Sequence, residues 1–318
     1  MSKEKLIEQE LFDSLQSDTP YDDAFRTMES EFDDLVIPLV NHMFGTAYGK
    51  DAVIKRFRNE HFVKHESGRD EKRVTDSGFE ITDNEITRVY HLECESKKYD
   101  GTILVRIFEY DSQIAKDMAE SDMFNLRLKL PNTGLLLLRS TGKEKQKAEI
   151  EIEFPDGRVG KVYVPILKIS DYDIDRIFAE KLYMLLPFYI FKFEKRLKSI
   201  DKDERALEEF ADMYRDIVSR MNEELEKGVL SVVTYYAIIK LIKKVAYNIA
   251  TKHVNIQRKV GSAMGGQVLD LPEIRIRNEG REEGRREGRR EAEAEIRRLR
   301  EENEALRKRI EAKENSCK

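Results

Sequence analysis

Apolar residues recur at steps of three and four between residues 20 and 45, which predicts a helix with one buried face. Pro20 suits the first helical turn and Gly45 suits the end of the helix. Asp22 and Asp23 fall in the first turn, where the helix dipole favours negative charge. Residues 46–72 have no comparable period, and we interpret them as an irregular connection.

Two stretches with a period of two follow, and they predict adjacent strands over residues 73–81 and from residue 89 onward. Asp76 stands in the middle of the first strand against β propensity, a local conflict that is more common at functional sites. Pairing of the two strands would bring Asp76 next to Glu93.

The second strand separates its residues by chemistry. Tyr90, Leu92 and Cys94 point to one side of the sheet, and the other side receives His91, Glu93, Glu95 and Lys97. A row of like charges is unfavourable unless a positive charge lies over it, and hard divalent cations prefer carboxylate oxygens. The same spacing is also typical of a solvated strand face.

A helix is expected over residues 102–118, since Ile103, Ile107 and other apolar residues line one face. Arg106, Tyr110 and Gln113 are spaced by four and three, so they form a polar stripe on another face. A guanidinium, a phenol and an amide on one ridge suit contact with phosphate oxygens, although a solvent-facing stripe has the same pattern.

Three more strands are expected over residues 134–140, 148–154 and 160–169, the last two as a hairpin around Asp156 and Gly157. This order predicts a mixed α/β sheet flanked by helices. Helical periodicity then dominates, and we interpret residues 171–260 as a helical subdomain that either stabilises the sheet or binds a partner. The resulting division is an α/β domain over 1–170, the helical subdomain, a linker over 261–277 and a tail over 278–318.

The tail repeats Gly, Glu and Arg every four residues and then carries a heptad pattern at Ile296, Leu299, Asn303, Leu306 and Ile310. An asparagine at one seam position favours a parallel pair of helices. We therefore expect a homodimer through residues 296–310, with a solvated charged helix as the alternative.

Charge and cysteine usage narrow the class of protein. The chain has 318 residues, of which 37% are charged, yet the net charge is only −5, so any surface that binds nucleic acid must be a local patch. Cys94 and Cys317 do not suggest a structural disulfide, and no secretory or membrane-spanning stretch is apparent. We expect a cytoplasmic protein, with no membrane partner and no organic cofactor.

The segments YDDAFR, TDSGFEI, HLECES and DGTILVRIFEYDSQIA occur in an order that resembles the PD-(D/E)XK nuclease family transposases, also called the recombination-promoting nuclease family. LLPFYIFKFEKRL, AMGGQVL and the EGRREGRRE tail are also similar to bacterial members. The resemblance implies a restriction-endonuclease-like PD-(D/E)XK core, a mixed sheet with flanking helices, followed here by the helical subdomain and a coiled-coil tail.

The resemblance also implies roles for individual residues. Asp76 and Glu93 match the family's acidic metal-binding positions, and Asp22 matches its N-terminal acidic position. Arg106, Tyr110 and Gln113 match the polar stripe that follows the second motif, here expected to bind DNA. Glu95 occupies a position where the family has Lys or Gln, and Lys97, two residues on, is the candidate to supply the missing positive charge.

The implied activity is Mg²⁺- or Mn²⁺-dependent hydrolysis of DNA phosphodiester bonds with little sequence specificity, linked to recombination or transposition. Asp76, Glu93, Glu95 and Lys97 are the expected catalytic residues, and the metal ligands are expected to be Asp76, Glu93 and Asp22. The alternative is a DNA-binding or assembly protein that keeps the fold but has lost the chemistry, which the glutamate at position 95 favours.

Overall fold

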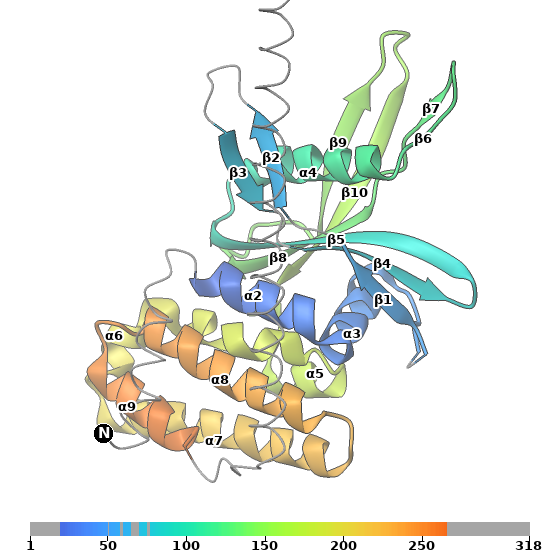
Figure 1. Cartoon of the computed structure of the whole chain (residues 1–318). Coiled ribbons are helices and arrows are strands. Elements are labelled where there is room, and N and C mark those ends of the chain that lie inside the picture. The colour runs from blue at the N-terminus through green and yellow to red at the C-terminus, as the bar shows by residue number, and fades with distance from the viewer. Residues whose placement is uncertain (1–19, 50, 58–59, 65–69, 75–76, 266–318) are drawn as a thin grey trace, which may run out of the picture. The chain divides into compact units, whose positions relative to one another are not determined.

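The computed structural model describes residues 20–49, 51–57, 60–64, 70–74 and 77–265 (Figure 1). Asp76 and the segment 296–310, through which a homodimer is expected, lie outside the described residues. The described residues belong to one compact unit that ends at Gly266. None of the described helices is long and apolar enough to cross a membrane.

A mixed sheet of six strands is the centre of this unit, in the order β1-β4-β5-β8-β10-β9. The strands are β1 (Val53–Arg56), β4 (Ser77–Asp83), β5 (Ile86–Lys98), β8 (Asn132–Arg139), β9 (Lys147–Glu153) and β10 (Val159–Lys168). β8 is parallel to both of its neighbours, β5 and β10. The other three pairs, β1–β4, β4–β5 and β9–β10, are antiparallel. The α/β class predicted from the element order is confirmed.

Helix α4 (Ile103–Asp117) connects the parallel strands β5 and β8 and covers one face of the sheet (Figure 1). Parallel neighbours need such a crossover because the end of the first strand and the start of the second lie at opposite edges of the sheet. Ile103 and Ile107 pack on Leu135 and Leu137 of β8, which forms a small separate core. The continuous apolar run of β8 is thereby buried on both faces, as expected for a central strand.

The opposite face of the sheet is covered by α2 (Pro20–Glu31), α3 (Asp33–Phe44) and the C-terminal helices (Figure 1). Tyr90, Leu92 and Cys94 of β5 point into this larger core, as the alternation predicted. α3 approaches the sheet closely at Gly134, where a Cβ atom would lie 2.7 Å from Cε of Met43.

The remaining helices share the same apolar core. They are η1 (Ile169–Asp171), α5 (Ile174–Ala179), η2 (Tyr183–Arg196), α6 (Leu197–Ile200), α7 (Glu204–Glu226), α8 (Val232–Ile249) and α9 (Val254–Ala263). η2 is a 3₁₀ helix that contains Pro187. A single apolar cluster therefore includes residues from both sides of the predicted boundary near residue 170, which itself stays a prediction.

Two predictions about the first part of the chain are wrong. The helix expected over residues 20–45 is divided at Phe32, whose backbone is extended with φ of −132°. The stretch 46–72 is not irregular, because it contains β1, β2 (Glu60–Lys64) and the start of β3 (Asp70–Val74), which pairs with β2. A further small hairpin joins β6 (Glu120–Ser121) to β7 (Leu126–Arg127).

Candidate functional site

The candidate site lies where β5 continues past the described start of β4. The last described pair of this hairpin joins Ser77 to Leu92, and Glu93 and Glu95 follow directly on β5. β8 remains the neighbour on the other side, with Glu93 opposite Leu135. The two glutamates therefore lie just beyond the described part of the β4–β5 hairpin.

Glu93 is buried, with 1% of its surface exposed, and it is held by two cationic side chains. Nη2 of Arg106 on α4 donates a hydrogen bond to its Oε2 at 2.9 Å, and Nε2 of His91 lies 3.1 Å from its Oε1. Burial of a carboxylate is costly unless it is paired in this way. The sequence predicted the position of Glu93 on its face but not its complete burial.

Behind Glu93 lies a buried network that the sequence reasoning missed. Nδ1 of His91 is 2.6 Å from Oδ1 of Asp111 on α4, and the same carboxylate oxygen accepts a hydrogen bond of 2.7 Å from Oγ1 of Thr133 on β8. His91 and Asp111 are both almost completely buried. The available signal was the position of His91 on the same strand face as Glu93.

The pKa of His91 responds to opposing effects. Burial lowers it, but the hydrogen bonds with Asp111 and Glu93 and the charges of these carboxylates outweigh burial and raise the pKa to about 9. At neutral pH the imidazolium donates from both ring nitrogens. The two carboxylates of Glu93 and Asp111 then balance the two cations, His91 and Arg106, so the four side chains together carry no net charge. Pairing of this kind is the condition under which charged groups can stay buried.

Asp22, in the first turn of α2, belongs to the same charge cluster. Burial raises the pKa of its carboxyl, Arg26 and Arg106 lower it, and Glu95 and Glu93 raise it. Burial is the largest of these effects, so the pKa of Asp22 is higher than the ordinary value although two arginines lie nearby. The structure thus brings the predicted residues Asp22, Glu93 and Glu95 into one electrostatic environment.

Glu95 is less buried than Glu93 and lies at the edge of the cluster. Its Oε2 is 3.8 Å from Nη2 of Arg106, and its Oε1 accepts a hydrogen bond of 2.7 Å from the backbone N–H of Lys97. β5 has an irregular register between Glu95 and Lys98, so the strict alternation that placed Lys97 beside Glu95 is interrupted. The side chain of Lys97 is exposed.

The polar stripe predicted on α4 does not face solvent as a unit. Arg106 is 41% exposed and turns toward the glutamates, whereas Tyr110 is only 8% exposed and packs edge-on against His91. Gln113 donates a hydrogen bond to Asp117 on the next turn. Arg106 is thus the member of the stripe that reaches both the glutamates and the surface.

The donor set of this cluster fits a hard divalent cation, because Asp22, Glu93 and Glu95 offer only carboxylate oxygens. Among the side chains that the structure describes, however, no three His, Cys, Asp or Glu residues are arranged as metal ligands. Oxygen atoms of Glu93 are engaged by His91 and Arg106 instead. Asp76, which is the predicted ligand besides Glu93 and Asp22, lies outside the described residues.

Comparison of the chain with protein-family models, with curated proteins and with solved structures finds no match.

Proposed function

We propose that the chain is a metal-dependent DNA endonuclease with a restriction-endonuclease-like PD-(D/E)XK core. The observation that carries this proposal is the position of Glu93. It is buried, it contacts Arg106, and it stands just past the described start of β4, which Asp76 precedes by one residue in the sequence. Paired acidic residues beside a cation are suited to phosphodiester chemistry.

In this proposal Asp76, Glu93 and Asp22 would hold Mg²⁺ or Mn²⁺. The bound metal would polarise the scissile phosphate and lower the pKa of a coordinated water. Glu95 would orient the attacking water or accept its proton, and Lys97 would supply positive charge close to the same strand. Arg106, with Tyr110 and Gln113 behind it on α4, is the phosphate contact, because it is half-exposed and already faces carboxylate oxygens.

The substrate we propose is DNA, cut with little sequence specificity in the cytoplasm during recombination or transposition. We also propose that the protein acts as a homodimer through residues 296–310, which light scattering on the full chain and on a variant with Leu299 and Leu306 replaced by Asp would test. Loss of the dimer in the variant is expected, and an unchanged mass would contradict it.

The activity is tested with supercoiled plasmid and Mg²⁺ or Mn²⁺. We expect nicking or linearisation by the wild type, and loss of both in Asp76→Ala and in Glu93→Gln. Glu93→Gln keeps the volume of the side chain, so its thermal unfolding serves to show that the fold is retained. Wild-type activity unchanged by both substitutions would rule out this site.

A second candidate is a non-catalytic DNA-binding protein of the same fold. Two observations favour it: a glutamate stands at position 95, and Oε1 and Oε2 of Glu93 each contact a cation of the protein itself. A wild type that retards DNA at low salt, does not cleave it and gains no thermal stability from Mg²⁺ or Mn²⁺ would favour this candidate over the nuclease.

A further inference from the structure

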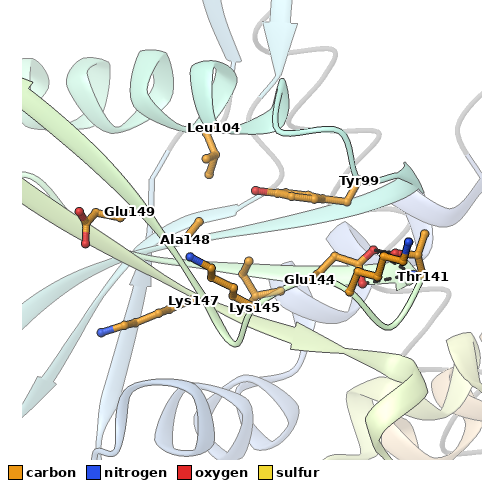
Figure 2. Close-up of a pocket in the computed structure, with 10 residues that line it drawn as sticks. Tyr99, Leu104, Thr141, Glu144, Lys145, Lys147, Ala148 and Glu149 are labelled. Carbon is orange, nitrogen blue, oxygen red and sulfur yellow. Dashed lines mark hydrogen bonds between the residues drawn. The ribbon is translucent and has the colours of Figure 1, made fainter.

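A cavity of about 590 Å³ lies where β5 and β8 end, next to the first turn of α4 and the start of β9. We call it the lysine pocket and define it by Tyr99, Leu104, Lys143, Lys145, Lys147 and Ala148, which line it (Figure 2). A cavity of this volume is within the range that holds small organic ligands. Leu104 lies on α4, which also carries Arg106, whereas the three lysines come from the segment between β8 and β9 and from the first residue of β9, which the candidate site does not use.

The cations of this pocket are available to a ligand. Among the described residues, no carboxylate forms an ion pair with Lys143 or Lys145, and Nζ of Lys147 rests 4.3 Å from the ring centroid of Tyr163. This differs from α7, where Arg205 pairs with Glu209 and other basic residues are paired in the same way. Three lysines without a carboxylate ion pair that line one cavity give it a local excess of positive charge, which suits an external anion.

The two carboxylates that line the pocket are already occupied. Glu144 accepts hydrogen bonds from the hydroxyl groups of Ser140 and Thr141, at 2.6 and 2.7 Å. Glu149 accepts one of 2.6 Å from Lys161. Both carboxylates stay negatively charged. Neither forms an ion pair with a lysine of the pocket, and the three lysines outnumber the two carboxylates, so the lining keeps an excess of positive charge.

The segment that carries the lysines is held in place by its backbone. Nζ of Lys168 donates to the carbonyl oxygen of Glu144 at 3.1 Å, and the N–H of Ile166 donates to the carbonyl oxygen of Gln146 at 2.8 Å. Anchoring on both sides of Lys145 reduces the entropy that a ligand would have to remove on binding.

The wall opposite the lysines is aromatic and apolar. The half-buried ring of Tyr99 extends across the cavity near Leu104, and Ala148 lies below them (Figure 2). No described residue forms a hydrogen bond with the Tyr99 hydroxyl. An aromatic platform beside several cations is the combination that binds an unpaired nucleotide, because the base stacks on the ring and the cations bind phosphates.

We propose that the lysine pocket binds an unpaired nucleotide of a DNA strand, with its base against Tyr99 and Leu104 and its neighbouring phosphates against Lys143 and Lys145. A base inside a duplex is stacked between its neighbours and does not enter a cavity of this kind. The partner is therefore a nucleic acid with a single-stranded segment, and we take it to be DNA because DNA is the proposed substrate.

The position of the pocket relates this partner to the candidate site. Tyr99 follows Glu95 by four residues, so their Cα atoms are at most about 14 Å apart. A strand that places one unpaired nucleotide in the pocket can therefore reach the glutamates within a few nucleotides. This step rests on the proposed nuclease function, whereas binding to the pocket does not.

Binding is measured by fluorescence anisotropy of a labelled oligothymidylate in EDTA over a series of salt concentrations. For Tyr99→Ala we expect a Kd raised about 10-fold, and for Tyr99→Phe a Kd within about twofold of the wild type, because stacking is kept. For Lys143→Ala/Lys145→Ala the salt dependence decreases by about 1.4 in slope, which corresponds to two phosphate contacts on a single strand.

The matched control is Lys198→Ala/Lys202→Ala, which replaces two exposed lysines of the helical region that form no ion pair with a described carboxylate. It removes the same charge and is expected to leave the Kd nearly unchanged. All these side chains are at least partly exposed, and thermal unfolding verifies that each variant is folded. Equal effects of the two lysine pairs, or wild-type binding by Tyr99→Ala, would overturn the proposal. So would a duplex that competes as well as the oligothymidylate does.

Failure of this proposal can be separated from failure of the nuclease proposal. Oligonucleotide binding that depends on Tyr99 without any plasmid cleavage would support the pocket and contradict the nuclease. Plasmid cleavage that depends on Glu93, together with binding indifferent to Tyr99, would support the nuclease and contradict the pocket.

Discussion

Nη2 of Arg106 donates a hydrogen bond to Oε2 of Glu93 at 2.9 Å and so joins α4 to β5 through a carboxylate that is otherwise enclosed. Thirteen residues separate the two in the sequence. The pair links the stability of the fold to the candidate chemistry, because the same guanidinium both neutralises Glu93 and reaches the surface.

Arg106→Ala is expected to lower the free energy of unfolding by about 1–3 kcal/mol, since it leaves a buried carboxylate with fewer partners. This loss of free energy is smaller than the loss expected on breaking a fully buried ion pair, because Arg106 is partly exposed to water. Urea denaturation measures the change. Arg205→Ala, at an exposed ion pair, is the control and is expected to change the free energy by less than about 1 kcal/mol.

Protein stability is expected to decrease as pH rises from about 6.5 to about 9. The folded pKa of His91, about 9, lies above its ordinary value of 6.5, so its contribution is complete below the ordinary value and is lost as pH rises through the folded one. The contribution is about 3 kcal/mol at most. Urea denaturation over this range, on the wild type and His91→Gln, isolates the effect. Parallel curves for the two proteins would contradict the assignment.

Asp22→Asn is expected to maintain or increase thermal stability at neutral pH. The carboxyl pKa is raised, mainly by burial, so the charged form is disfavoured in the folded state and its removal relieves that cost. In the nuclease proposal the same variant responds less to Mg²⁺, because a ligand oxygen is lost. Thermal unfolding with and without Mg²⁺ measures both effects, and Asp23→Asn is the neighbouring control. A stability loss in Asp22→Asn alone would oppose this description of the cluster.

Gly134→Ala is expected to destabilise the protein by about 1–2 kcal/mol through overpacking. Its Cβ would meet Cε of Met43 at 2.7 Å and Cζ of Phe44 at 3.1 Å, so α3 must shift or repack. Gly49→Ala, where no atom lies within 4 Å of the added Cβ, is expected to be nearly neutral. Chemical denaturation compares the two, and shortening Met43 to Ala in the Gly134→Ala background is expected to recover part of the loss.

The sequence predicted long periodic elements well. The helix expected over residues 102–118 is α4, and the apolar run from Gly134 is the central strand β8. Long segments repeat their pattern often enough to identify the period. β1 has only four residues, which is too short for a period to be identified. The formation of such a short edge strand depends on its pairing with β4.

Tertiary packing explains the break at Phe32, which periodicity did not predict. The apolar residues continue at steps of three and four through Phe32. Its backbone is nevertheless extended, so α2 ends before it and α3 begins after it, with Asp33 and Asp34 in the first turn. Asp34 then accepts a hydrogen bond from Thr234, far along the chain. A local pattern carries no information about a partner of that kind.

At the candidate site the sequence placed Glu93 and Glu95 correctly on β5 but did not reveal how they are neutralised. Strand alternation identifies residues on a common face, and it does not identify what lies above that face. Asp111 lies on α4 and Thr133 on β8, and only the fold brings them to His91. A strict period of two also could not predict the irregular register after Glu95.

The hydrogen bond from Oγ1 of Thr234 to Oδ2 of Asp34 spans 200 positions of the chain. α2 packs on α8 as well as on β5, so the helix that carries Asp22 has part of its docking surface near the end of the described sequence. During synthesis from the N-terminus, β5 and α4 can associate long before α8 has left the ribosome. The docking surface of the helix that carries Asp22 is therefore complete only after α8 has been synthesised.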